Sequence, residues 1–133
     1  MTTDEALPIT SREADSDPIT IFHNPRCSKS RGALELVDAQ GTKYKVVEYL
    51  KAPPDRATLD RIARLYPGPV ADLVRTSDAA FIDLDIDPAT LTSVDSVVDL
   101  LVRHPEVMQR PILVRGDGVV IARPPELVAE LLD

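Results

Sequence analysis

Cys27, the only cysteine of the chain, lies in a basic and hydroxyl-rich segment, HNPRCSKSR at residues 23–31. This segment follows a short apolar run and opens a helical pattern, so Cys27 falls at a strand-to-helix turn. The free N–H groups and positive dipole end of a helix stabilise an anion there. Flanking cations such as Arg26 and Lys29 also lower the pKa of a thiol below its free value of ~8.5. We therefore interpret Cys27 as a reactive thiolate, although a lone cysteine is often a small buried side chain.

The spacing around Cys27 argues against two common cysteine chemistries. A dithiol redox site of the C-x-x-C type requires a second cysteine at the position of Ser30. A phosphatase-type C-x5-R loop requires an arginine at the position of Ala33, and Arg31 comes too early. Cys27 is therefore predicted to be a monothiol that depends on a second thiol from another molecule.

The elements that must position Cys27 can be predicted from apolar periodicity and from the positions of glycine and proline. Continuous apolar runs predict strands at 18–22 and 44–50. Helical spacing predicts helices at 28–40 and at 93–103. A further helix should carry an apolar face formed by Leu59, Ile62, Ala63 and Tyr66.

The remaining segments are predicted in the same way. Residues 70–75 should form a short helical piece, and the acidic stretch 76–92 one or two further turns. Two apolar runs between 110 and 124 predict a β-hairpin with Asp117-Gly118 as its turn. A final helix at 124–132 should begin at its prolines.

This order of elements predicts an α/β fold. A strand-helix-strand start favours a parallel pair with a right-handed crossover, and the late hairpin adds antiparallel strands. The result is a mixed four-stranded sheet flanked by helices, the arrangement of thioredoxin-like folds, with a helical insertion before the C-terminal hairpin and helix.

Composition limits the classes of function. The chain has 133 residues, which suits one domain at 18–133, preceded by an acidic extension at 1–17 that we expect to be disordered. The net charge of −7 argues against general binding of nucleic acid or anionic membranes. No apolar run approaches the ~20 residues of a membrane span, and the N-terminus lacks the features of a signal peptide. We expect a soluble cytoplasmic protein.

The segment ITIFHNPRCSKSR resembles the active-site segment of the glutaredoxin-coupled arsenate reductases, a thioredoxin-fold family with the motif HNP-x-C-x-x-SR. Spx-type transcription regulators and small reductase-like proteins share this segment. The resemblance continues in YLKAPP at 49–54 and in His104-Pro105. It extends from about residue 18 to the end of the chain.

The resemblance implies a binding site for an oxyanion. The family holds its oxyanion with three arginines, which match Arg75 in DLVR, Arg110 in QRPILV and Arg123 in IARPPE. The planar fork of arginine bonds two oxyanion oxygens at once, and a net negative protein needs such local cations. The position of Pro111 implies a cis peptide bond facing the cysteine. Arg103 and Arg115 match no motif and are expected at the surface.

The resemblance also implies a reaction and its partners. Arsenate would bind among the three arginines and be attacked by Cys27. Glutathione or another small thiol would then reduce the adduct, and glutaredoxin would restore the enzyme. His23 would either assist ionisation of Cys27 or hold the turn, and Ser30 could donate a hydrogen bond to the thiolate or the oxyanion. We expect no bound cofactor, no metal site and a monomer.

Two alternatives remain at the level of sequence. The chain could be an Spx-like redox-responsive transcription regulator, although such regulators typically carry C-x-x-C. It could also be a thiol reductase acting on another small substrate, because three arginines suit several oxyanions.

Overall fold

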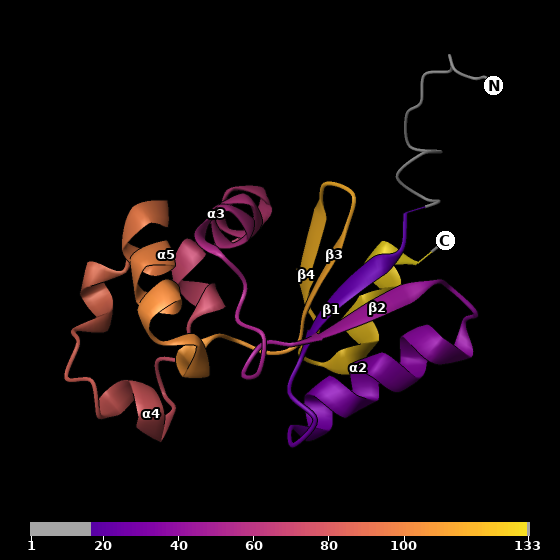
Figure 1. Cartoon of the computed structure of the whole chain (residues 1–133), viewed down its shortest axis with the longest axis horizontal. Helices are drawn as coiled ribbons and strands as arrows, with labels where there is room; N and C mark the ends of the chain where they lie inside the picture. Colours follow the sequence, from indigo (N-terminus) through magenta and orange to yellow (C-terminus); the bar gives the residue numbers. More distant parts are fainter. Residues whose placement is uncertain (1–16, 133) are drawn as a thin grey trace, which may run out of the picture.

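The structure, a computed structural model, describes residues 17–132. It contains a four-stranded mixed sheet of order β2-β1-β3-β4 (Figure 1). β1 runs parallel to β2 and antiparallel to β3, and β4 pairs antiparallel with β3. The strands are β1 (Ile19–His23), β2 (Tyr44–Glu48), β3 (Ile112–Arg115) and β4 (Gly118–Ile121). The predicted mixed sheet is therefore confirmed.

One face of the sheet is covered by α2 (Ser28–Ala39), which connects β1 to β2, and by the C-terminal helical segment η4 (Pro125–Leu131) (Figure 1). The apolar positions Ala33 and Val37 of α2 are fully buried. They pack in a cluster that also contains Ile19, Ile21, Leu113, Ala122 and Val128. This cluster holds the N-terminus of α2 against the end of β1, where Cys27 lies.

The predicted helical insertion forms a compact group at the opposite end of the molecule from α2 (Figure 1). Its main pair is α3 (Arg56–Leu65) and α5 (Val94–Arg103), which pack together through buried side chains such as Ile62 and Val98. The shorter pieces are η1 (Val70–Leu73), α4 (Ala79–Ile82), η2 (Pro88–Thr90) and η3 (Pro105–Val107). Phe22 and Ile112 of the sheet belong to the same core, so the insertion and the sheet share one apolar interior.

Side-chain caps define where these helices begin. Asp55 accepts a hydrogen bond from the backbone N–H of Thr58 at the start of α3. Ser93 and Ser96 form a reciprocal capping box at the start of α5, which therefore begins at Val94, one residue later than predicted. His104 caps the other end of α5, as expected for a residue after the last turn.

Two predictions about the strands differ from the structure. The hairpin turn is Gly116-Asp117 and not Asp117-Gly118, because Arg115 pairs with Gly118. Gly116 takes the positive φ of +58° that the first turn position demands. The strand predicted to end at residue 50 ends at Glu48, whose carbonyl accepts the N–H groups of Lys51 and Ala52 in a turn.

The C-terminal helix predicted at 124–132 is a 3-10 helix over Pro125–Leu131. In this helix the backbone N–H of Leu127 donates to the carbonyl of Pro124, three residues earlier. The piece predicted at 70–75 is likewise a 3-10 turn over Val70–Leu73.

Arg115 is not the surface residue that was expected. Its side chain is only 9% exposed. Its Nε donates to the carbonyl of Asp17 at 2.9 Å and its Nη1 to the carbonyl of Leu131 at 2.8 Å. Arg115 thus joins the two ends of the described chain. The extension predicted at 1–17 lies outside the described residues except for Asp17, and within residues 17–132 no helix is long and apolar enough to cross a membrane.

Candidate active site

The fold brings Cys27 and the predicted arginines to one end of the sheet. Residues 24–27 connect β1 to α2, while Arg110 precedes β3 and Arg123 follows β4. The register pairs Phe22 with Ile112 and Ile112 with Ile121, so the end of β1, the start of β3 and the end of β4 are neighbours. Residues almost a hundred positions apart therefore converge on one thiol.

Cys27 is the N-cap residue of α2 and is partly exposed. Its backbone N–H donates to the carbonyl of Asn24 at 3.0 Å, and its carbonyl accepts the N–H of Arg31 at 3.0 Å. This places the sulfur over the first turn of α2, where the backbone N–H groups of Lys29 and Ser30 favour a negative charge on it.

The surroundings of Cys27 lower the pKa of its thiol to about 7. Burial acts in the opposite direction and is the largest single influence. It is outweighed by the backbone N–H of Ser30, the guanidinium of Arg110, the backbone N–H of Lys29 and the guanidinium of Arg123. A substantial fraction of the thiol is therefore ionised at neutral pH.

The turn before Cys27 is held by a buried set of polar contacts. The hydroxyl of Ser30, which is fully buried, lies 3.0 Å from Nδ1 of His23 and accepts the backbone N–H of Asn24 at 3.0 Å. The Asn24 side chain accepts the N–H of Arg26 at 2.9 Å. Arg31 completes the loop by donating to the carbonyl of Pro25 at 2.9 Å.

These contacts distinguish between the two roles expected for His23, which were to assist ionisation of Cys27 or to hold the turn. Burial lowers the pKa of His23, so its imidazole is neutral at pH 7 and does not supply a positive charge to Cys27. Its contact with Ser30 instead holds the turn. The hydroxyl of Ser30 is used in the same turn, and the influence of Ser30 on the thiol comes through its backbone N–H.

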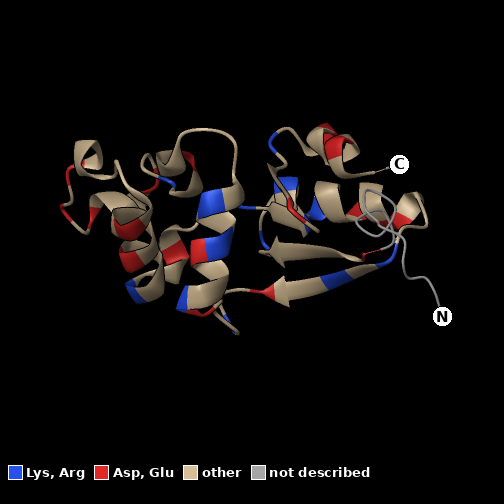
Figure 2. Ribbon diagram, turned by 90° about the horizontal axis from the view of Figure 1, so that it is seen from above, with Lys and Arg blue, Asp and Glu red and all other residues tan. Residues whose placement is uncertain are grey.

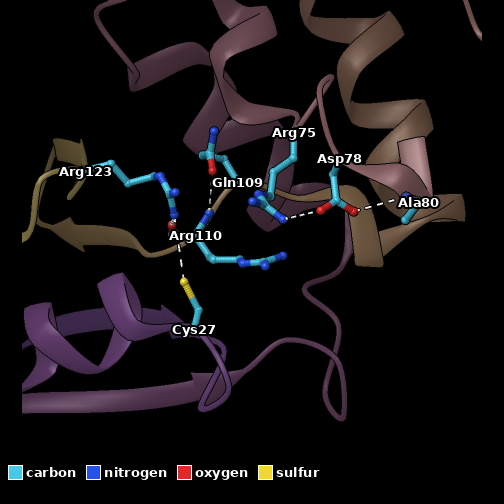
Figure 3. A network of polar contacts seen from close by, with 7 residues as sticks. All are labelled: Cys27, Arg75, Asp78, Ala80, Gln109, Arg110 and Arg123. Carbon is cyan, nitrogen blue, oxygen red and sulfur yellow. Dashed lines mark hydrogen bonds and ion pairs between the residues drawn. The ribbon is translucent and has the colours of Figure 1, made fainter. Parts of the chain in front are cut away.

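Arg123 and Arg110 lie beside the sulfur (Figure 3). Nη1 of Arg123 donates to Sγ of Cys27 at 3.8 Å and to the carbonyl of Arg110 at 2.9 Å. Arg110 precedes a cis peptide bond to Pro111, as the resemblance implied, and Arg123 precedes a second cis bond to Pro124 that was not predicted. Burial lowers the pKa of the Arg110 guanidinium, but the neighbouring Cys27 and Tyr49 raise it overall.

Arg75 lies on the side of Arg110 away from Cys27, with its side chain pointing toward that of Arg110 (Figure 3). Its backbone N–H donates to the carbonyl of Val107 at 2.8 Å, which fixes the chain beside the segment leading to Arg110. Its Nη1 donates to a carboxylate oxygen of Asp78 at 2.7 Å. Both side chains of this ion pair are largely buried, at 19% and 30% exposed.

Two neighbours of the arginines were not predicted as site residues. Asp78 is three residues after Arg75, a spacing that signals an ion pair only if the segment turns there. Tyr49 was noted only as part of the YLKAPP match, yet its phenol interacts electrostatically with both Arg110 and Arg75. Within residues 17–132, no group of three histidine, cysteine or acidic side chains is placed to hold a metal ion.

A hollow of about 330 Å³ lies at Arg123. Its other walls come from the helical insertion, the segment before β3, the end of β4 and η4: Tyr66, Asp72, Gln109, Ile121 and Leu127. Cys27, Arg75 and Arg110 do not line this hollow.

Known proteins similar to this chain were found by sequence and by structure. The model of the ArsC family matches residues 22–131. The uncharacterised protein YfgD of Escherichia coli K12 is 37% identical over 115 residues, 86% of this chain and 96% of that protein. An arsenate reductase of Neisseria meningitidis is 36% identical over 115 residues, 86% and 97% of the two chains.

Among solved structures, an arsenate reductase from Vibrio cholerae superposes with a TM-score of 0.78 at 32% identity, over 87% of this chain and 98% of that one. The likeness confirms the predicted thioredoxin-like fold for the sheet and its flanking helices. The family match begins within β1 and extends to the end of η4, so its range includes every residue of the candidate site.

Proposed function

The chain belongs to the ArsC family, and we propose that it is an arsenate reductase in which the thiolate of Cys27 is the nucleophile. The observation that carries this proposal is the contact of 3.8 Å between Sγ of Cys27 and Nη1 of Arg123 at the N-terminus of α2. A thiolate and a guanidinium side by side suit a reaction between a sulfur nucleophile and an oxyanion.

Arsenate binds to the guanidinium groups of Arg110, Arg123 and Arg75. The surrounding protein does not attract anions in general: the net charge is −7, and residues 76–102 contain no lysine or arginine. Figure 2 shows acidic positions spread over the helical insertion. Binding of a multiply charged oxyanion therefore depends on these few arginines. Arg75 contributes less net charge than the other two because Asp78 neutralises part of it.

The first chemical step forms a bond between Cys27 and arsenic. The thiolate attacks arsenic and displaces water or hydroxide, which gives a cysteine-arsenate adduct. With a pKa of about 7, Cys27 is sufficiently ionised to attack at neutral pH without a separate general base. The N–H groups of Lys29 and Ser30 stabilise the thiolate before the attack.

The second step uses a small thiol of the glutathione type. Its sulfur forms a disulfide with Cys27, and the electron pair of the broken sulfur–arsenic bond remains on arsenic, which passes to the +3 state. Arsenite is thereby released. Glutaredoxin then attacks the glutathione sulfur of the mixed disulfide and forms its own disulfide with glutathione, and Cys27 leaves as the restored thiolate. A thiol of low pKa is a good leaving group in this exchange. The proposed chemistry requires no bound cofactor.

The proposed reaction also bears on the cellular compartment and the oligomeric state of the enzyme. Cys27 must be reduced at the start of each turnover, so we place the protein in a reducing compartment such as the cytoplasm. All the site residues come from one chain, which makes a monomer sufficient.

The test measures arsenite formed from arsenate by the purified protein with glutathione and glutaredoxin. Cys27→Ser should abolish arsenite production, and Arg110→Ala should lower kcat/KM by about a hundredfold, as for loss of an oxyanion donor. Arg103→Ala, which changes an exposed arginine at the end of α5, is the matched control and should retain activity.

An inactive wild-type protein with an intact, alkylatable Cys27 would contradict the proposal if exchange of the small thiol also failed to give arsenite. Activity with another oxyanion in that experiment would instead identify a reductase of a different substrate.

A further inference from the structure

Two buried polar atoms beside the site have no hydrogen-bond partner. Within residues 17–132, the side-chain nitrogen and oxygen atoms in this condition are the hydroxyl of Tyr49 and Nε of Arg110. Tyr49 is fully buried and packs in the core shared by the sheet and the helical insertion. Buried polar groups are almost always paired, because an unpaired one costs about 1–3 kcal/mol. Two such atoms at one site therefore call for a joint explanation.

The sheet register places these two groups close together. His23 pairs with Glu48 and Phe22 pairs with Ile112. Asn24, Tyr49 and Arg110 each lie one or two residues beyond the paired strands, at the same end of the sheet. The Tyr49 hydroxyl interacts with the side chains of both Arg110 and Asn24, which places the three groups next to one another.

The chemistry of the two groups is complementary. The Nε–H of arginine can only donate, whereas a neutral phenol can both donate and accept. Burial raises the pKa of Tyr49, so its hydroxyl stays neutral, and it interacts electrostatically with Arg110. Neither atom has exposed surface, so neither can touch a ligand in the site. What they can do is determine the direction of the Arg110 guanidinium, which helps to lower the pKa of the Cys27 thiol.

We propose that Tyr49 is a positioning residue for Arg110, and that its hydroxyl accepts the Nε–H of Arg110 and so directs the guanidinium toward Cys27 and the bound oxyanion. The effect on the oxyanion rests on the proposed function, whereas the effect on the thiolate does not. A rotation of two side chains brings the pair into contact, and the two unpaired polar atoms then satisfy one another.

The test is Tyr49→Phe, which removes the hydroxyl and keeps the ring in the core. Alkylation of Cys27 by iodoacetamide as a function of pH gives the pKa of the thiol without any arsenate. We expect this pKa to rise above the wild-type value of about 7, since Arg110 helps to lower it. With arsenate, we expect KM to rise about tenfold and kcat to change less, as for one lost charge-assisted hydrogen bond.

Tyr44→Phe is the matched control, because Tyr44 is 37% exposed and its hydroxyl bonds to Asp38 away from the site. In an Arg110→Ala background, Tyr49→Phe should have no further effect on the pKa of Cys27 or on KM, because the residue it positions is gone. A purely structural tyrosine would show the same loss of stability in both backgrounds and no change in either site measurement.

The outcomes separate this inference from the proposed function. If the pKa of Cys27 rises in Tyr49→Phe but no variant reduces arsenate, the positioning role stands and the arsenate reductase proposal falls. If the enzyme reduces arsenate and Tyr49→Phe leaves both the pKa and KM unchanged while Arg110→Ala alters them, the positioning role is overturned.

Discussion

At the scale of single residues, the thiol of Cys27 is ionised near neutral pH without a neighbouring base. Burial raises its pKa, while two backbone N–H groups and two guanidinium groups lower it to about 7. His23, the only imidazole in the turn, is neutral and bonded to Ser30. The positive surroundings of the sulfur are therefore made of groups that do not titrate in the physiological range.

The pH dependence of Cys27 follows from this arrangement. Folding lowers the pKa of the thiol from ~8.5 to about 7, so the ionised form stabilises the folded protein. This contribution is fully present above ~pH 8.5 and is lost as the pH falls through about 7. The free energy of unfolding of the wild type relative to Cys27→Ser should therefore increase from ~pH 6 to ~pH 9. Urea denaturation at the two pH values measures it, and a difference that does not vary with pH would contradict the lowered pKa.

Asp78 is expected to weaken the attraction of the site for an oxyanion. Its carboxylate lies 2.7 Å from Nη1 of Arg75 and neutralises part of that charge in a largely buried setting. Asp78→Asn keeps an acceptor for the N–H of Ala80 and removes the negative charge. We expect KM for arsenate to fall about threefold, the size of a modest electrostatic gain.

Asp83→Asn is the control for Asp78→Asn, because Asp83 is an exposed acidic residue at the other end of α4. Steady-state kinetics of arsenite formation distinguish the two. A rise of KM in Asp78→Asn would mean that the carboxylate serves chiefly to position Arg75.

At the scale of elements, the start of α2 depends on a buried hydroxyl. Cys27 caps α2 without a side-chain hydrogen bond of its own. The turn that leads to it is held instead by Ser30, which accepts the N–H of Asn24 and bonds to His23. The nucleophile is thereby left free of a capping role that would occupy its sulfur.

Ser30→Ala should destabilise the protein by about 2 kcal/mol, because it leaves the buried Asn24 N–H and His23 Nδ1 without their partner. Ser28→Ala, at the exposed first position of α2, should have an effect below about 0.5 kcal/mol. Chemical denaturation provides both values. Equal stabilities of the two variants would show that the Ser30 contacts contribute nothing to the turn.

At the scale of the whole molecule, Arg115 connects β3 to both ends of the described chain through the carbonyls of Asp17 and Leu131. Arg115→Met, which keeps the volume of the side chain and removes its donors, should destabilise the protein by about 2 kcal/mol. Activity at a temperature where the variant is folded should be unchanged, since Arg115 lies outside the site. Arg103→Met is the exposed control, and thermal unfolding with arsenite assays tests both statements.

Much of the fold was predictable because its signals are local. The apolar runs of β1 and β3 each depend on neighbours in sequence. The hairpin turn was misplaced because Asp117 has a glycine on each side, and only the pairing of Arg115 with Gly118 decides between them.

The site was only partly predictable, because several of its contacts form only in the folded protein. Cys27 and its arginines could be named from short motifs, and the fold brings Arg110 and Arg123 beside the sulfur. The buried position of Arg115 and the unpaired hydroxyl of Tyr49 depend on tertiary packing. The spacing of nearby residues in the sequence does not predict such packing. The ion pair of Arg75 with Asp78 depends on a turn that an acidic, weakly patterned segment does not reveal.

The central claim is that Cys27 attacks arsenate and then forms a disulfide with a small thiol. The most direct measurement is mass spectrometry of the protein after incubation with arsenate and glutathione, with glutaredoxin omitted so that the mixed disulfide accumulates. We predict one glutathione in disulfide linkage at Cys27, formed only when arsenate is present and lost on addition of glutaredoxin. An unmodified Cys27 in the presence of arsenate, in protein whose thiol still reacts with iodoacetamide, would contradict the claim.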